Sequence, residues 1–181
     1  MTKFTTTLNQ IRAHRPCAEG WQKLLSHLGK TKADDEPLSL LTILESNGLD
    51  DALWAARAIQ GHDRDFRLFA VWAARQVQHL MTDARSLAAL DVAELFAEGA
   101  ATVDEQAAAD AAAWDAAVAV AGAWAAWAAA WAATGAVWSA AWSAAGARAA
   151  SRAAQAKRLR QMIEEGGWVG STQPLPVSDE K

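Results

Sequence analysis

The fold is decided by residues 102–156, which read TVDEQAAADAAAWDAAVAVAGAWAAWAAAWAATGAVWSAAWSAAGARAASRAAQA. Between Ala101 and Ala156 lie 30 alanines and six of the ten tryptophans of the chain. Alanine has the highest intrinsic helix propensity, and Thr102 with Glu105 forms the sequence signature of a capping box. Acidic residues cluster at the start of the stretch and basic residues at its end, which complements the helix dipole. The stretch therefore predicts one long helix, or a helical hairpin if the chain breaks at Thr134-Gly135.

Five tryptophans recur at helical spacing and define what we term the Trp seam: Trp124, Trp127, Trp131, Trp138 and Trp142. On a helix these positions fall within a sector of about 60°. The favoured interpretation is that the Trp seam packs as core, because alanine offers almost nothing else to bury along this helix. The alternative is a surface for a partner or for a second copy of the chain, since tryptophan is frequent at binding hot spots.

Residues 116–147 contain no charged side chain, and this length is sufficient for a helix that spans a membrane. The stretch lacks Leu, Ile and Phe, however, and its tryptophans are spread through the middle, whereas tryptophan prefers the two membrane interfaces. We therefore expect no membrane insertion. The first residues show no apolar segment of a secretory signal, so the sequence favours a cytoplasmic protein.

The first hundred residues divide into short helices separated by glycine, proline and polar loops. The helices that we expect cover residues 5–13, 21–28, 39–46, 51–60 (capped by Asp50), 66–81 (capped by Asp63 or Asp65) and 84–98 (capped by Asp83). No segment shows the alternation of a half-buried strand. The sequence thus predicts an all-α protein without a sheet. We expect residues 1–100 to form a globular part of short helices and residues 101–165 to form the Ala/Trp-rich long helix or hairpin of the same domain. Residues 166–181 are expected to form a flexible tail.

Charge and motifs narrow the classes of function. The 17 basic and 21 acidic residues give a formal charge of −4, whereas proteins that coat nucleic acids carry a basic excess, so no DNA partner is expected. A single cysteine, Cys17, excludes an intrachain disulfide and a cysteine-based zinc site. The sequence has no phosphate loop, nucleophile elbow or dinucleotide fingerprint. We therefore expect a protein that is not an enzyme and has neither a metal nor another cofactor.

Two groups of residues in the first hundred are candidate sites. Asp91, Glu94 and Glu98 are spaced three and four apart and share one helix face, which is either a solvated face or an acidic surface that meets a basic partner. An alternative is a site for an anionic ligand such as a nucleotide, with arginines on the anion and a tryptophan stacked on a base. Its candidate residues are Trp54, Arg57, Arg64, Arg67, Trp72, Arg75 and Arg85.

Several segments in a fixed order carry a family resemblance. They are NGLDDALWAARA (47–58), RLFA (67–70) with ARQV (74–77), DARSLAAL (83–90), FAEGA (96–100) and AWDAA (113–117). Together they resemble the Imm-5-like family of immunity proteins of bacteria and their phages, over roughly Cys17 to Met162. Ala84 stands where family members often have proline. Many relatives also use more Arg and Asp in the repeat, where this chain has large aromatic residues.

The resemblance implies a non-enzymatic inhibitor, an immunity or counter-defence protein that binds a toxin or defence effector and neutralises it stoichiometrically. An acidic protein suits a basic effector such as a nuclease, because complementary charge speeds encounter. The resemblance brings no functional residues with it. A self-assembling interaction protein, dimeric through the Trp seam, remains a separate possibility.

Overall fold

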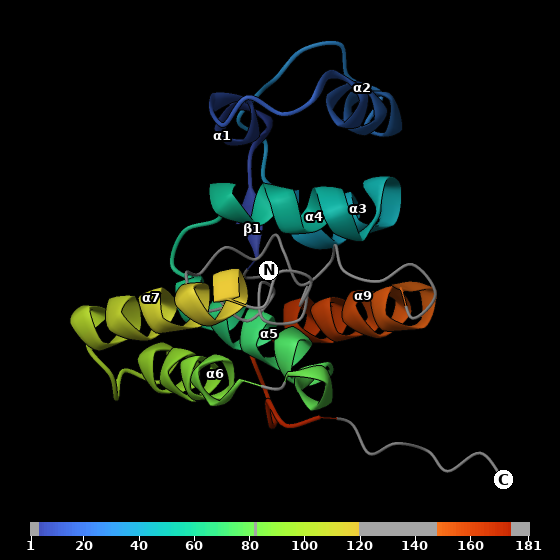
Figure 1. Ribbon diagram of the computed structural model, residues 1–181. Helices are drawn as coiled ribbons and strands as arrows, with labels where there is room; N and C mark the ends of the chain where they lie inside the picture. Colours follow the sequence, from blue (N-terminus) through green and yellow to red (C-terminus); the bar gives the residue numbers. More distant parts are fainter. Residues whose placement is uncertain (1–3, 82, 120–147, 175–181) are drawn as a thin grey trace, which may run out of the picture. The chain divides into compact units, whose positions relative to one another are not determined.

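The computed structural model describes residues 4–81, 83–119 and 148–174 (Figure 1). Within these ranges it contains eight α-helices, two short 3-10 helices and one pair of two-residue strands. The prediction of a mainly helical protein is confirmed. The prediction that it has no sheet is wrong in one detail, because β1 (Thr5–Thr6) pairs antiparallel with β2 (Leu38–Ser39). Strands of two residues are too short to leave an alternating pattern in the sequence.

The chain divides into two compact units that are described separately. Of the described residues, 4–63 and 148–169 form the first unit, and the rest form the second. The helices of the first unit are α1 (Leu8–Ala13), α2 (Ala18–His27), α3 (Leu40–Asn47), α4 (Leu49–Ala55), η1 (Ala56–Ala58) and α9 (Arg148–Glu165). Side-chain oxygens cap two of these helices: Thr7 Oγ1 accepts the N–H of Gln10 at 3.1 Å, and Ser39 Oγ accepts the N–H of Leu41 at 3.2 Å. Such caps pair N–H groups that a helix start leaves without partners.

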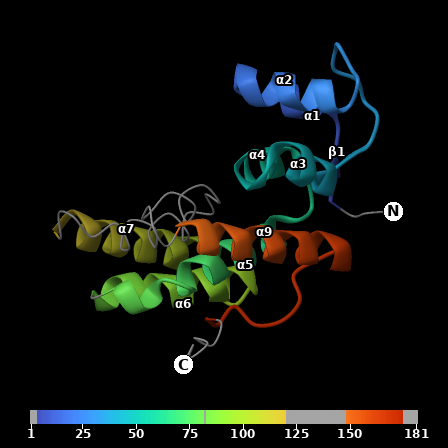
Figure 2. The ribbon, with the colours of Figure 1, turned by 90° about the vertical axis from the view of Figure 1, so that its right-hand side faces the viewer.

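Helix α9 completes the core of the first unit, although it comes late in the chain. It contacts both α3 and α4 (Figure 2). Leu159, Met162 and Ile163 of α9 are 0%, 2% and 1% exposed. On the outside of this contact Arg160 pairs with Glu45 at 2.8 Å. The first unit is therefore assembled from two segments that are far apart in the sequence.

The helix expected over 51–60 is present with shifted bounds, but the expectation that Asp50 caps it is wrong. Helix α4 begins at Leu49, and its N-cap is Gly48, which has no side chain that could cap the helix. The carboxylate of Asp50 is instead engaged by Arg152 of α9 in an ion pair. The helix tightens into the 3-10 turn η1 and ends there. A contact distant in sequence has thus replaced the local cap.

Gly48 connects α3 to α4 in a conformation that only glycine adopts readily, with φ +96° and ψ −176°. No atom lies within 4 Å of the position that a Cβ would occupy, so a substitution there is opposed by the backbone alone. We expect Gly48→Ala to lower the free energy of unfolding by about 3 kcal/mol, as measured by urea denaturation. Gly29→Ala is the control, because Gly29 is equally open but has φ +64°, where alanine costs only about 1 kcal/mol. Equal losses in the two variants would contradict this explanation.

The second unit contains α5 (Asp63–Arg75), η2 (Gln78–Leu80), α6 (Ala84–Ala97) and α7 (Val103–Ala119). Helix α5 is buried on nearly all sides, since every residue from Phe66 to Arg75 except Arg67 is buried. This helix begins earlier than expected, with Asp63 as its first residue, and it ends at Arg75 rather than continuing to residue 81. It is the central element of the unit.

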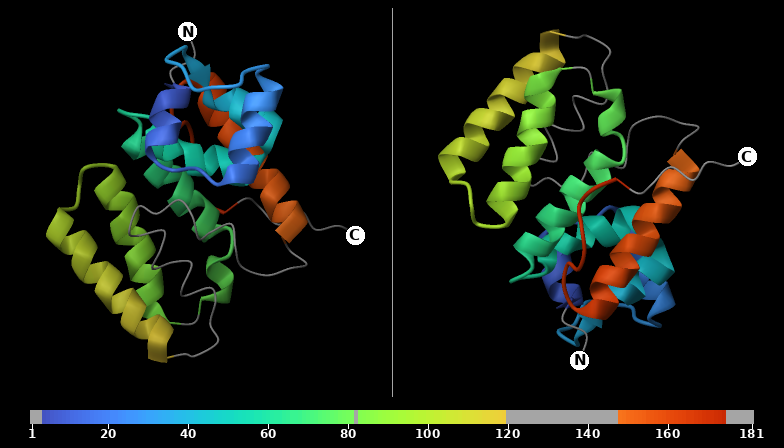
Figure 3. Two further views of the ribbon diagram at one scale, coloured as in Figure 1. Left: turned by 90° about the horizontal axis from the view of Figure 1, so that it is seen from above. Right: turned by 90° about the horizontal axis from the view of Figure 1, so that it is seen from below.

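Helices α6 and α7 form an antiparallel hairpin (Figure 3). Alanines make their contact, with Ala89 and Ala93 of α6 packed with Ala109 of α7 and Val71 of α5. Small side chains of this kind allow helices to approach closely. The hairpin therefore needs few large apolar side chains on its inner face.

The helix starts in the hairpin follow local sequence signals. The predicted capping box is confirmed: Thr102 donates its N–H to Glu105 Oε2 at 2.8 Å, and Glu105 donates its N–H to Thr102 Oγ1 at 3.2 Å. The predicted cap of α6 is confirmed as well, because Asp83 Oδ1 accepts the N–H of Arg85 at 2.9 Å. Both signals depend on residues within three positions of each other, which explains why the sequence reveals them.

Candidate functional site

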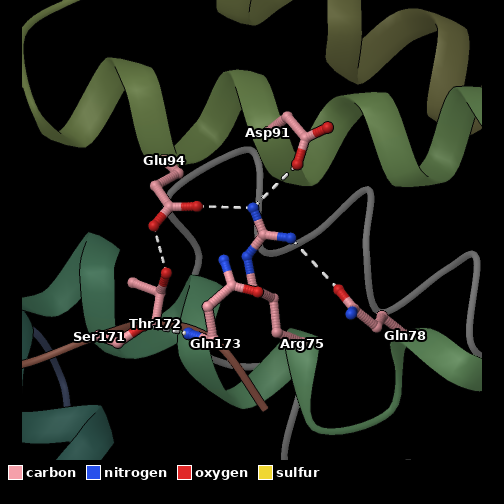
Figure 4. Close-up of polar contacts among 7 residues, drawn as sticks. All are labelled: Arg75, Gln78, Asp91, Glu94, Ser171, Thr172 and Gln173. Carbon is pink, nitrogen blue, oxygen red and sulfur yellow. Dashed lines mark hydrogen bonds and ion pairs between the residues drawn. The ribbon is translucent and has the colours of Figure 1, made fainter.

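Among the residues whose side-chain burial the structure describes, Arg75 is the one charged residue that is buried, with a side chain only 8% exposed. Its Nη2 donates to Asp91 Oδ1 at 2.9 Å and to Glu94 Oε2 at 2.6 Å, and its Nη1 donates to Gln78 Oε1 at 3.2 Å (Figure 4). A buried charge is tolerated when it is paired and hydrogen-bonded. The two carboxylates of α6 therefore hold the end of α5 in place.

The same contacts set the acid–base behaviour of this network. Burial opposes the charge of Arg75, but the hydrogen bonds to Asp91 and Glu94 outweigh it, so the pKa of Arg75 is raised above its usual value. The guanidinium consequently stays charged at any pH at which the protein is folded. With one positive and two negative groups, the network carries a formal charge of −1.

Glu94 also connects α6 to the end of the chain. The hydroxyl of Thr172 donates to Glu94 Oε1, and Thr172 is only 4% exposed. Next to it, Gln173 donates its N–H to Ser171 Oγ at 3.0 Å. These residues belong to the segment for which the composition predicts a tail. A single carboxylate thus contacts both α5 and the C-terminal segment.

Glu98 completes the acidic group predicted on α6. Arg64 Nη2 donates to Glu98 Oε1 at 2.9 Å, and both side chains are about half exposed. All three predicted carboxylates therefore meet arginines of α5, which offsets most of their charge. Asp91 keeps the largest exposure, at 67% of its side chain. Of the three, it is the one best placed to meet a partner as well as Arg75.

Four of the five arginines of the alternative ligand site lie in the second unit and have partners there. Besides Arg64 and Arg75, Arg85 pairs with Asp83 at 2.8 Å. The guanidinium carbon of Arg67 lies 4.7 Å from the ring centre of Phe96, a cation–π contact. An anionic ligand would have to displace a carboxylate from three of the five predicted arginines.

The two tryptophans of this alternative lie in different surroundings. Trp72 is 3% exposed and packs against Phe69, with ring centres 5.9 Å apart. Its burial contradicts the idea that Trp72 stacks on a nucleotide base. Trp54, in the first unit, is half-buried, and the guanidinium carbon of Arg57 lies 4.7 Å from its ring centre.

Asp83 accepts three hydrogen bonds from Arg85, two from the guanidinium and one from the backbone N–H. They lower the pKa of Asp83 from 3.8 to about 2, chiefly through the side-chain bonds. Because the folded pKa is the lower one, the stabilisation is fully present above about pH 4 and is lost as the pH falls toward 2.

We therefore expect Asp83→Asn to lower the unfolding midpoint in urea by an amount that is constant from pH 7 to about pH 4. Below that pH the difference from the parent protein should shrink toward zero. Parallel urea titrations at several pH values measure it. A difference that stays constant from pH 7 to pH 2.5 would rule out this role for the Asp83 carboxylate.

The Trp seam, with the possible break at Thr134-Gly135, lies outside the described residues. Both of its interpretations, core and interface, therefore stay predictions. So do the proposed homodimer and the length of the Ala/Trp-rich helix.

Two other expectations concern metals and membranes. In residues 4–81, 83–119 and 148–174, no group of three or more His, Cys, Asp or Glu side chains is placed to hold a metal ion. Over the same ranges, no helix is both long enough and apolar enough to cross a bilayer.

Sequence reasoning missed a feature of α6 that lies away from its carboxylates. One face of α6 is buried, and Leu87 and Leu95 lie outside that face, where they are 38% and 48% exposed. The signal was present in the sequence, because leucine and alanine occur on every side of residues 84–97. A search for one apolar stripe does not detect a helix that has two.

Comparison of the chain with known proteins does not identify its family. The chain matches no family model, and neither a curated protein nor a solved structure is significantly similar to it. The resemblance to Imm-5-like immunity proteins therefore rests on the quoted sequence segments alone.

Proposed function

We propose that this protein is a non-enzymatic inhibitor that binds a protein effector, a toxin or a defence protein, and neutralises it. The resemblance to Imm-5-like proteins supplies the functional class. Such an inhibitor needs a complementary surface and requires no chemistry of its own.

The observation that carries the proposal is the charge of the α6–α7 hairpin. Residues 84–119 contain seven acidic residues and one arginine, a formal charge of −6. Arg64 and Arg75 of α5 pair with three of these acids, which still leaves a formal charge of −4 on the hairpin and these two arginines. Two of the acids, Asp104 and Glu105, lie exposed in the first turn of α7. An uneven charge of this kind attracts a basic protein and raises the rate of specific association.

Growth and binding assays test the proposal. The tagged protein is expressed in its natural host, and the protein that co-purifies in a fixed ratio is identified and expressed alone. We expect that protein to be basic and to arrest growth, and co-expression of the present chain to restore growth. The absence of any such effector, together with no rescue of growth, would reject the proposed function.

A matched pair of variants tests the contribution of the hairpin charge. Asp104→Lys reverses a charge on the hairpin, and Glu19→Lys reverses one in the first unit. Both residues are exposed and lie in the first turn of their helices, so the loss of favourable interaction with the helix dipole is the same. We expect the association rate constant to fall about fivefold for Asp104→Lys and less than twofold for Glu19→Lys at low salt. Equal effects of the two would exclude the hairpin as the attracting surface.

A further inference from the structure

Helix α6 has two apolar faces. Ala89, Leu90 and Ala93 lie on its inner face and are at most 4% exposed. On the opposite face Leu87 and Leu95 remain 38% and 48% exposed. A surface helix normally carries polar residues on the face that points away from the core. The outer face of α6 departs from this rule.

The exposed residues form a continuous line along the helix. Leu87, Asp91 and Leu95 recur every four residues, and Ala88 lies beside them, so at about 1.5 Å per residue the line extends over about 12 Å. We term Leu87, Ala88, Asp91 and Leu95 the outer stripe. All four residues are exposed. The outer stripe therefore presents two leucines with a carboxylate between them, and Asp91 is 67% exposed despite its bond to Arg75.

We propose that the outer stripe is the docking surface for the effector, and that the effector presents a basic amphipathic helix to it. This inference rests on the proposed function and names the partner of the same protein. Apolar side chains of such a helix would cover Leu87 and Leu95, and a lysine or arginine between them would meet Asp91. This is the mode in which amphipathic helices bind to apolar surfaces elsewhere.

Charge favours a basic helix of the effector over two other possible occupants of the outer stripe, namely residues 120–147 of the same chain and a second copy of α6. Residues 120–147 of the same chain are apolar, but they contain no basic side chain that could pair with Asp91. In a two-fold antiparallel pairing of α6 with a second copy, centred on the stripe, Asp91 would face its own twin, which is unfavourable. A basic partner removes both difficulties, because the hairpin carries one arginine against seven acidic residues.

Three labelled synthetic peptides of 18 residues test the chemistry of the outer stripe without the effector. One is a helix with leucines on one face and lysines on the other, the second has glutamate in place of lysine, and the third has the first composition in scrambled order. Fluorescence anisotropy measures their binding to the full chain. We expect only the first peptide to bind well, at least about tenfold tighter than the other two. Equal binding of the basic and acidic peptides, or of the ordered and scrambled ones, would overturn the proposal.

The test variant is Leu87→Gln combined with Leu95→Gln, and the control is Val169→Gln, an apolar side chain that is 53% exposed in the first unit. We expect the double variant to bind the basic peptide at least about tenfold more weakly and the control to bind within twofold of the parent. Both should melt within about 2 °C of the parent, because exposed side chains contribute little to stability. A large drop in melting temperature would show that the chain's own residues cover the stripe, and a dimer that the double variant converts to a monomer would show a second copy there. Either result would overturn the proposal.

The effector identified by the growth assay separates this inference from the proposed function. If the parent protein captures the effector and the double variant captures it equally well, the docking surface is wrong and the function stands. If no effector exists, the function fails, whereas the peptide experiment still reports on the stripe. If the parent protein captures the effector and the double variant does not, the result would support both the proposed function and the docking surface.

Discussion

Leu159→Ala combined with Ile163→Ala is expected to unfold the first unit. Both side chains are almost completely buried, at 0% and 1% exposure, on the face of α9 that completes the core. Truncating a buried leucine or isoleucine to alanine costs about 2–5 kcal/mol, so the two together remove about 6 kcal/mol. That loss is comparable with the total stability of a typical domain, about 5–15 kcal/mol. We expect a large loss of helical circular dichroism and rapid proteolysis of the first unit at 37 °C.

The matched control is Lys157→Ala combined with Gln161→Ala, which has the same spacing on the exposed side of the same helix. Alanine preserves helix propensity there and removes no core contact, so we expect the control to melt within a few degrees of the parent. If the core variant melts like the control, α9 does not belong to the core of this unit.

Arg75→Met is expected to cost about 3 kcal/mol in the free energy of unfolding of the second unit. Methionine retains the length of the side chain, but it leaves Asp91 and Glu94 without the charge that both of them face. Removing one partner of a largely buried pair is strongly destabilising, because the remaining charge has lost its compensation. Glu94 is affected most, since its side chain is only 27% exposed. Urea denaturation, followed by tryptophan fluorescence, measures the loss.

Two further variants identify the cause. Arg85→Met removes an arginine–aspartate pair in which the arginine is 48% exposed, and we expect a loss of stability well below that of Arg75→Met, at most about 1 kcal/mol. Adding Glu94→Gln to Arg75→Met removes the uncompensated charge, so this double variant should be more stable than Arg75→Met alone. A double variant that is less stable than both single variants would indicate that Arg75 acts through packing and not through its charge.

Features encoded within a few residues could be predicted from the sequence. The capping box of Thr102 and Glu105, the cap of Asp83 and the mainly helical character depend on such local signals, and all three are confirmed. Asp50 shows the limit of this reasoning. Its position before an apolar stripe predicts a cap, but a residue about one hundred positions later, Arg152, engages its carboxylate instead.

Burial could be predicted less well than secondary structure. Over residues 66–81 the helical spacing of apolar side chains predicts one buried stripe that includes Phe66 and Phe69. The structure also buries Val71, Trp72 and Arg75. A single amphipathic stripe assumes that one side of a helix faces solvent, and a central helix has no such side. The sequence also does not predict that Arg75 is the centre of the candidate site. Its carboxylate partners are 16 and 19 residues away on another helix, beyond the range of local sequence signals.

The first unit is built from two segments that are distant in the sequence, and this has a consequence for its synthesis on the ribosome. Residues 4–63 emerge first, but the helix that completes their core begins only at Arg148. At translation rates of about 5–20 residues per second, roughly 4–17 seconds separate the two segments. During that interval α3 and α4 lack their contact with α9, while α5, α6 and α7 of the second unit are synthesised. The core of the part made first is therefore closed only after three helices of the second unit have been made, and until then its apolar side is open to chaperones.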